Sequence, residues 1–126
     1  MILNYFLVGL GGSLGAMSRV LLGKFLPTAI MGIPAYIMLI NIIGCFLMGI
    51  LVEILAFHGS LSTGNLHYFL ASGFLGGFTT FSSFAFEFGL LFAKQDYKAG
   101  IIYILLSTCI SLIAFFLGAK LMKLLI

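Results

Sequence analysis

Four long apolar runs, separated by short polar or glycine- and proline-containing breaks, constrain this chain more than any other feature of its sequence. They cover residues 3–22, 35–57, 66–92 and 99–121. A helix needs about 20 mostly apolar residues to cross a bilayer, and each run has about that length. The runs are continuous, whereas the strands of a membrane barrel alternate. We therefore predict an all-α protein with one four-helix transmembrane domain over residues 1–126, a multi-pass protein of the cell (plasma) membrane.

The composition excludes a soluble globule. Charged residues make up 7% of the chain and hydrophobic residues 63%, whereas about a quarter of a soluble domain is charged. The formal net charge of +3 is not gathered into a basic cluster, so we expect the lipid bilayer as a partner and no nucleic acid. Cys45 and Cys109 lie inside apolar runs, and we expect both to be packing residues without a disulfide or metal role.

The charges between the runs leave the orientation open. With four spans, both termini and the loop at residues 58–65 share one side of the membrane. The lysines divide almost evenly between the two sides, Lys120 and Lys123 against Lys24, Lys94 and Lys98. The positive-inside rule therefore allows two interpretations. One is a weakly biased single orientation, and the other is insertion both ways round, which permits an antiparallel homodimer.

Two polar side chains lie in the first and second runs. Arg19, near the end of the first, either reaches the lipid headgroups, which its spacing favours, or forms a vestibule cation that concentrates anions. Asn41 lies within the second run. An amide at that depth needs partners, so it either links helices or lines a polar path, and the sequence leaves both open. We assign no role to Glu53.

The third run carries paired glycines followed by hydroxyl residues in the middle of a membrane crossing, at residues 73–84. This pattern favours a break in the helix. Unwound backbone at that depth frees carbonyl oxygens, which protein, water or a cation must then meet. Physical arguments alone favour a simple kink in a tightly packed helix over a cation site.

Beyond the glycines, helical spacing separates a polar face from an aromatic one: Thr80, Ser83 and Glu87 against Phe81, Phe84 and Phe88. An aromatic stripe usually packs against other helices. The edge of a phenyl ring is nevertheless electropositive, so it can also face a small anion. In the fourth run, hydroxyls recur every four residues at Tyr103, Ser107 and Ser111. A single hydroxyl would bond back to its own helix, but three in register indicate a polar track.

Three motifs resemble the helix signatures of the Fluc (CrcB) fluoride channels. Residues 73–87, GFLGGFTTFSSFAFE, resemble the third-helix signature, and residues 11–19, GGSLGAMSR, resemble the first. Asn41 with Gly44 matches the second. The resemblance covers essentially the whole chain. Ser83 and the pair Ala85-Phe86 stand where close relatives often carry Thr and Ser-Val, which leaves open which hydroxyls contact fluoride.

The resemblance implies a fluoride-selective channel that lets cytoplasmic fluoride leave passively and so protects the cell from fluoride toxicity. It implies a channel and not an enzyme. The assembly it implies is a dual-topology antiparallel homodimer with two separate fluoride pathways. A structural sodium ion at the dimer centre is held in that family by main-chain oxygens of the broken third helix, which match Gly76 and Thr79 here.

The resemblance also implies the residues of the fluoride pathway. Asn41 matches the pore amide, Phe81 and Phe84 match the pore-facing phenylalanines, and Arg19 matches the vestibule arginine. The polar track of that family matches five residues: Thr80, Ser83, Tyr103, Ser107 and Ser111. Glu87 matches an acidic residue to which we assign no role.

Two rival functions remain to be weighed. A dual-topology exporter of the small multidrug type depends on an intramembrane carboxylate, but the first run has no acidic residue and the chain has no Trp. In a non-conducting membrane assembly subunit, the polar residues would serve helix packing only. The resemblance favours the channel over both.

Overall fold

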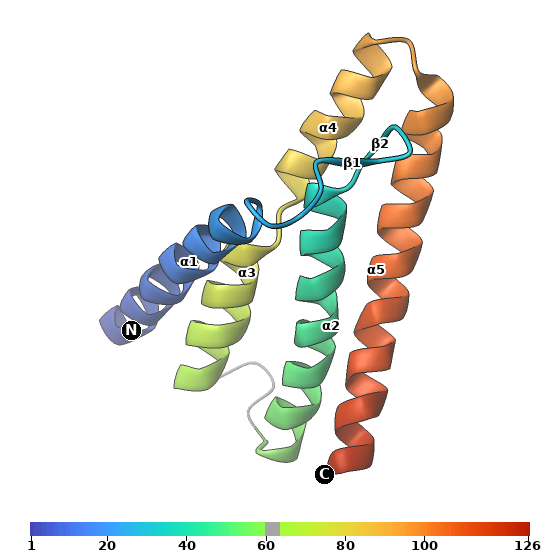
Figure 1. The fold of residues 1–126 in the computed structure, drawn as a ribbon. Coiled ribbons are helices and arrows are strands. Elements are labelled where there is room, and N and C mark those ends of the chain that lie inside the picture. Colours follow the sequence, from blue (N-terminus) through green and yellow to red (C-terminus); the bar gives the residue numbers. More distant parts are fainter. Residues whose placement is uncertain (60–63) are drawn as a thin grey trace.

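The structure, a computed structural model, describes residues 1–59 and 64–126. The four long segments of the chain alternate in direction, with η1, α3 and α4 running the same way, so that both ends lie in the lower half of Figure 1 and the α4–α5 connection lies at the top. The helices are α1 (Ile2–Leu22), α2 (Tyr36–Phe57), η1 (His67–Leu75), α3 (Gly76–Phe78), α4 (Phe81–Ala93) and α5 (Tyr97–Leu125). A short antiparallel hairpin, β1 (Ala29–Ile30) and β2 (Ile33–Pro34), joins α1 to α2.

Four segments of the described chain are long and apolar enough to cross a membrane: Ile2–Leu22, Tyr36–Phe57, His67–Ala93 and Tyr97–Leu125. The prediction of an all-α, multi-pass membrane protein is therefore confirmed. Helix α5 continues four residues past the predicted end of the fourth run, so Lys120 and Lys123 belong to the helix. Of the predicted loop at 58–65, residues 60–63 lie outside the described part of the chain.

The helices form two closely packed pairs. In one, α1 packs against the first half of the third run, which is η1 and α3; in the other, α2 packs against α5. Glycines allow the backbones to approach each other in both pairs. A methyl group at Gly15 would overlap the Phe74 carbonyl. Between α2 and α5 the contact is reciprocal, because a methyl group at Gly49 would meet the Phe115 carbonyl and one at Gly118 would meet the Phe46 carbonyl.

This geometry predicts opposite effects for two glycine substitutions. Gly118→Ala should lower the free energy of unfolding by about 1–3 kcal/mol, because the new methyl group forces backbone apart. Gly89→Ala should be neutral or raise it by up to about 1 kcal/mol, because a methyl group there meets nothing within 4 Å and alanine favours the helix. Thermal unfolding in detergent measures both changes. Equal effects at the two positions would contradict the packing of α2 on α5.

The third apolar run consists of several segments. It begins as the π-helix η1, a wide helix that the sequence did not predict, and continues through one turn of α3. Thr79 (φ −81°, ψ 158°) and Thr80 (φ −153°, ψ 122°) then adopt extended backbone conformations before α4 begins at Phe81. The Thr80 side chain caps α4 by accepting a hydrogen bond from the Ser83 amide. These two threonines position the site described next.

Candidate functional site

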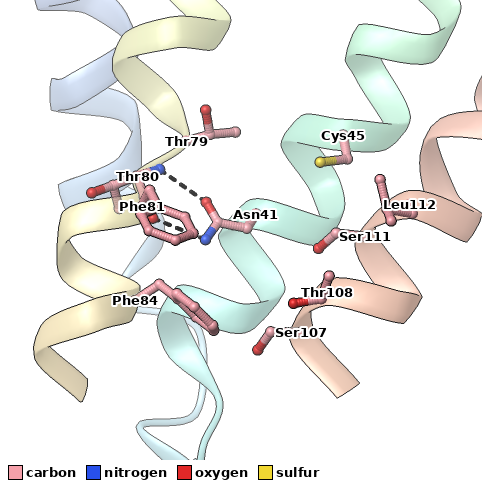
Figure 2. A pocket seen from close by; sticks show the side chains of 10 residues that line it. All are labelled: Asn41, Cys45, Thr79, Thr80, Phe81, Phe84, Ser107, Thr108, Ser111 and Leu112. Carbon is pink, nitrogen blue, oxygen red and sulfur yellow. Dashed lines mark hydrogen bonds between the residues drawn. The ribbon is translucent and has the colours of Figure 1, made fainter. Parts of the chain in front are cut away.

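A pocket of about 270 Å³ opens between α2, the α3–α4 junction and α5 (Figure 2). Its lining is Asn41, Cys45, Thr79, Thr80, Phe81, Phe84, Ser107, Thr108, Ser111 and Leu112. Among these lining residues, none carries a charge. The pocket brings six of the sequence-predicted pathway residues together: Asn41, Thr80, Phe81, Phe84, Ser107 and Ser111. Tyr103, Ser83 and Arg19 are not part of its lining.

Asn41 pairs with the extended backbone of Thr80 in the way that a neighbouring strand would. Its Nδ2 donates to the Thr80 carbonyl at 3.0 Å, and the Thr80 amide donates to its Oδ1 at 2.9 Å. The side-chain nitrogen of asparagine carries two hydrogens, so this pairing leaves the second N–H of Asn41 for another acceptor. The structure therefore joins the two interpretations of Asn41, because the side chain both links α2 to the third run and lines the pocket.

Two backbone amides in this segment donate to side chains and not to the carbonyls that would accept from them in a helix. In a continuous α-helix the Thr80 amide would donate to the Gly76 carbonyl, and the Ser83 amide would donate to the Thr79 carbonyl. Here the first donates to Asn41 and the second to the Thr80 Oγ1, at 3.2 Å. The carbonyls of Gly76 and Thr79 thereby lose their helical donors, and these are the two carbonyls that the family resemblance matched to a cation site.

Arg19 lies against this segment and not in the pocket lining. Its side chain is half-buried, and its Nη1 lies 3.5 Å from the Thr79 carbonyl oxygen. The Tyr36 hydroxyl donates to the Arg19 carbonyl at 2.9 Å and ties the end of α1 to the start of α2. Arg19 therefore contacts protein backbone, a contact that neither sequence-based interpretation of this residue included.

Three aromatic rings form a row beside the pocket. The centroids of Phe81 and Phe84 are 5.3 Å apart, and those of Phe84 and Tyr103 are 5.1 Å apart. Phe81 is 79% exposed in the single chain although it lines the pocket. Phe88 belongs to a different cluster, where its ring contacts Phe92. The predicted aromatic stripe therefore divides into a pocket-lining pair and a packing residue.

Three hydroxyls on one face of α5 are buried without partners among the described residues. Tyr103, Ser107 and Ser111 are 0%, 4% and 8% exposed, and within the described chain their hydroxyl oxygens have no hydrogen-bond partner. A buried, unsatisfied hydroxyl costs about 1–3 kcal/mol. Three such groups on one helix face are a poor arrangement for packing alone. Ser107 and Ser111 line the pocket and can instead donate to a ligand or water there.

The remaining polar groups differ in how they are used. Thr80 Oγ1 lies 3.2 Å from both Ser82 Oγ and Ser83 Oγ, so these hydroxyls bond to one another at the start of α4. Sequence reasoning assigned no pathway role to Cys45 or Thr108, both of which line the pocket. Their signal was weak: Cys45 stands one turn after Asn41, and Thr108 is the neighbour of Ser107.

The ligands that the described residues offer to a metal ion are carbonyl oxygens and not clustered side chains. Within the described residues, no group of three or more His, Cys, Asp or Glu side chains is placed to hold an ion. A transition-metal site is therefore not supported there. Carbonyl oxygens, such as those of Gly76 and Thr79, are ligands for hard cations.

Comparison with known proteins gives consistent results. The model of the family described as "CrcB-like protein, Camphor Resistance (CrcB)" matches residues 6–119. A Francisella philomiragia protein is 43% identical over 116 residues, covering 89% of this chain and 88% of the relative. Proteins from Prosthecochloris aestuarii and Rhizobium etli are each 38% identical, covering 93% and 94% of this chain and 91% and 94% of the relatives. All three relatives are named fluoride-specific ion channel FluC. This chain belongs to the CrcB family.

Proposed function

We propose that this chain is the subunit of a fluoride-selective ion channel, and that the pocket between α2, α4 and α5 is part of the anion path. The observation that carries this proposal is the combination of an uncharged pocket between helices long and apolar enough to cross a membrane with buried, unpartnered hydroxyls on its wall. The family relatives, named as fluoride-specific channels, support the choice of ion.

The chemistry of the pocket suits a small, strongly hydrated anion. Such an ion enters a dry site only if several donors replace its water. Here the donors are the second N–H of Asn41, the hydroxyls of Ser107 and Ser111, and the electropositive ring edges of Phe81 and Phe84. A fixed cation in the lining would hold the anion too strongly to release it, and the lining contains none.

Passive conduction is sufficient for the proposed role. Hydrogen fluoride enters a cell in acid surroundings as the neutral acid and dissociates in the less acidic cytoplasm. An inside-negative potential then favours anion exit by roughly 2.3 kcal/mol per 100 mV. The channel therefore needs no energy coupling to protect the cell from fluoride.

We further propose that two copies assemble as a dual-topology antiparallel homodimer with two fluoride pathways and a structural sodium ion between them. The diverted amides at Thr80 and Ser83 support this cation site, because they free the Gly76 and Thr79 carbonyls from helical donors, and the Thr79 carbonyl has only the long 3.5 Å contact with Arg19 in their place. One chain supplies two such oxygens, and a two-fold axis would supply two more. Ion-replacement diffraction that finds no density between the paired third runs would contradict the cation.

The α5 hydroxyls distinguish a conduction role from a packing role. Ser107→Ala and Ser111→Ala should each lower fluoride flux about tenfold, because a donor is lost, while thermal stability stays unchanged or rises slightly, because an unsatisfied polar group is removed. Ser13→Ala is the matched control, since the Ser13 hydroxyl bonds to the Leu10 carbonyl of its own helix. Lower stability with unchanged flux in the α5 variants would favour the packing subunit.

A growth experiment tests the function in cells. A bacterial strain lacking its own fluoride export grows poorly on fluoride in acid medium. Expression of this chain should restore growth under fluoride and leave tolerance to toxic cationic dyes unchanged. Dye resistance without fluoride resistance would instead favour an exporter of the small multidrug type.

A further inference from the structure

Cys45 does not have the environment of a simple packing residue. It lies on α2 one turn after Asn41, is half-buried, and lines the pocket. Figure 2 shows its sulfur on the side of α2 that faces the pocket, with Ser111 opposite on α5. The other cysteine, Cys109, is exposed and does not line the pocket. The chain thus has one pocket cysteine and one that serves as its natural control.

A second observation indicates that a ligand reaches this part of the pocket. Ser111 is 8% exposed and lies on the pocket wall within reach of the Cys45 thiol, and its hydroxyl has no other hydrogen-bond partner within the described chain. Ser107, one turn earlier on α5, is likewise buried on the pocket wall without a hydrogen-bond partner in the described part of the chain. Figure 2 shows Ser107 toward Phe84 and Ser111 at about the level of Asn41, so Cys45 stands next along the pocket wall after the last of these hydroxyls.

We propose that the Cys45 thiol lies in the anion path and forms, with the Ser111 hydroxyl at the level of Asn41, a pair of donors that extends the polar wall by one turn of α2. This inference rests on the proposed channel function. A thiol is a weak hydrogen-bond donor on a polarizable, uncharged side chain, so it adds to anion solvation without trapping the ion. It also makes Cys45 a site at which covalent modification of one sulfur closes the path.

Thiol labelling in vesicles tests this proposal. Two single-cysteine variants, C109S and C45S, are reconstituted in liposomes and treated with methyl methanethiosulfonate, a small uncharged reagent. The cysteine thiolate attacks the sulfenyl sulfur of the reagent, methanesulfinate leaves, and a methyl mixed disulfide remains. Fluoride efflux is measured before and after treatment, and mass spectrometry gives the labelled fraction of each cysteine.

The expected result is a fall in the flux of C109S by about tenfold or more, because the added methylthio group then obstructs a narrow anion path and removes the thiol donor. Dithiothreitol should restore that flux. The flux of C45S should stay at its own untreated rate whether or not Cys109 is labelled. Fluoride in the labelling buffer should slow the reaction at Cys45 and leave the reaction at Cys109 unchanged.

Two results would overturn the inference: Cys45 that remains unlabelled in intact vesicles, or Cys45 that is labelled with no loss of flux. An absence of fluoride flux in both untreated variants and in the wild-type chain is a different outcome. It would contradict the proposed function. In that case the labelling rate still tests the inference: a rate at Cys45 that fluoride leaves unchanged would overturn it as well.

Discussion

Replacing Asn41 by aspartate is expected to reduce fluoride flux at least about 100-fold, equivalent to roughly 2.7 kcal/mol. The substitution removes the Nδ2 donor that bonds to the Thr80 carbonyl, together with the second N–H that is proposed to donate to the anion. It also places a carboxylate oxygen against the Thr80 carbonyl and a negative charge on the wall of an anion path, where low polarity strengthens repulsion. Fluoride-electrode recordings from vesicles measure the flux, and size-exclusion chromatography checks the assembly.

Asn65→Asp is the matched control, because it introduces the same chemical change at an exposed position. Its flux should stay within about twofold of wild type, since a distant exposed charge is screened by salt. Wild-type flux in Asn41→Asp would remove this amide from the path. A misassembled Asn41→Asp protein would be informative in a different way, because it would assign Asn41 to the bond with Thr80 alone.

Phe81→Ile is expected to have a comparable effect, again at least about 100-fold. Isoleucine keeps an apolar side chain of similar bulk but removes the ring, whose electropositive edge is the feature proposed to face the anion. It also removes the contact between the Phe81 and Phe84 rings, whose centroids are 5.3 Å apart. Efflux from vesicles measures the change.

Phe86→Ile controls for a general loss of aromatic surface from α4. Phe86 is 63% exposed, close to the exposure of Phe81, but it does not line the pocket. Its replacement should leave flux close to wild type. Equal losses at Phe81 and Phe86 would mean that α4 responds to any change in its lipid-facing or partner-facing side chains and not to the pocket ring in particular.

Sequence reasoning was sufficient for the four crossings, because length and apolarity determine them directly. It did not predict the π-helix η1, which depends on how closely another helix can approach. A methyl group at Gly11 would overlap the Phe69 carbonyl of η1, and an approach of this kind has no signature within the third run itself.

The candidate site could be predicted only in part, again because contacts between distant segments leave no local pattern in the sequence. Asn41 had to find partners at membrane depth, but the sequence could not say that one side chain both pairs with Thr80 and lines the pocket. The contact of Arg19 with the Thr79 carbonyl joins residues 60 positions apart, and helical spacing says nothing about such pairs. Cys45 was predicted to be a packing residue, because a cysteine in an apolar run does not indicate which face of its helix it occupies.

The fluoride-to-chloride permeability ratio of the purified chain tests the central claim most directly. Liposomes loaded with potassium fluoride or potassium chloride are given valinomycin, and ion-selective electrodes follow the release of each anion. The proposed function predicts rapid fluoride efflux and chloride release no faster than from protein-free vesicles. Retention of fluoride, or equal release of chloride, would contradict it.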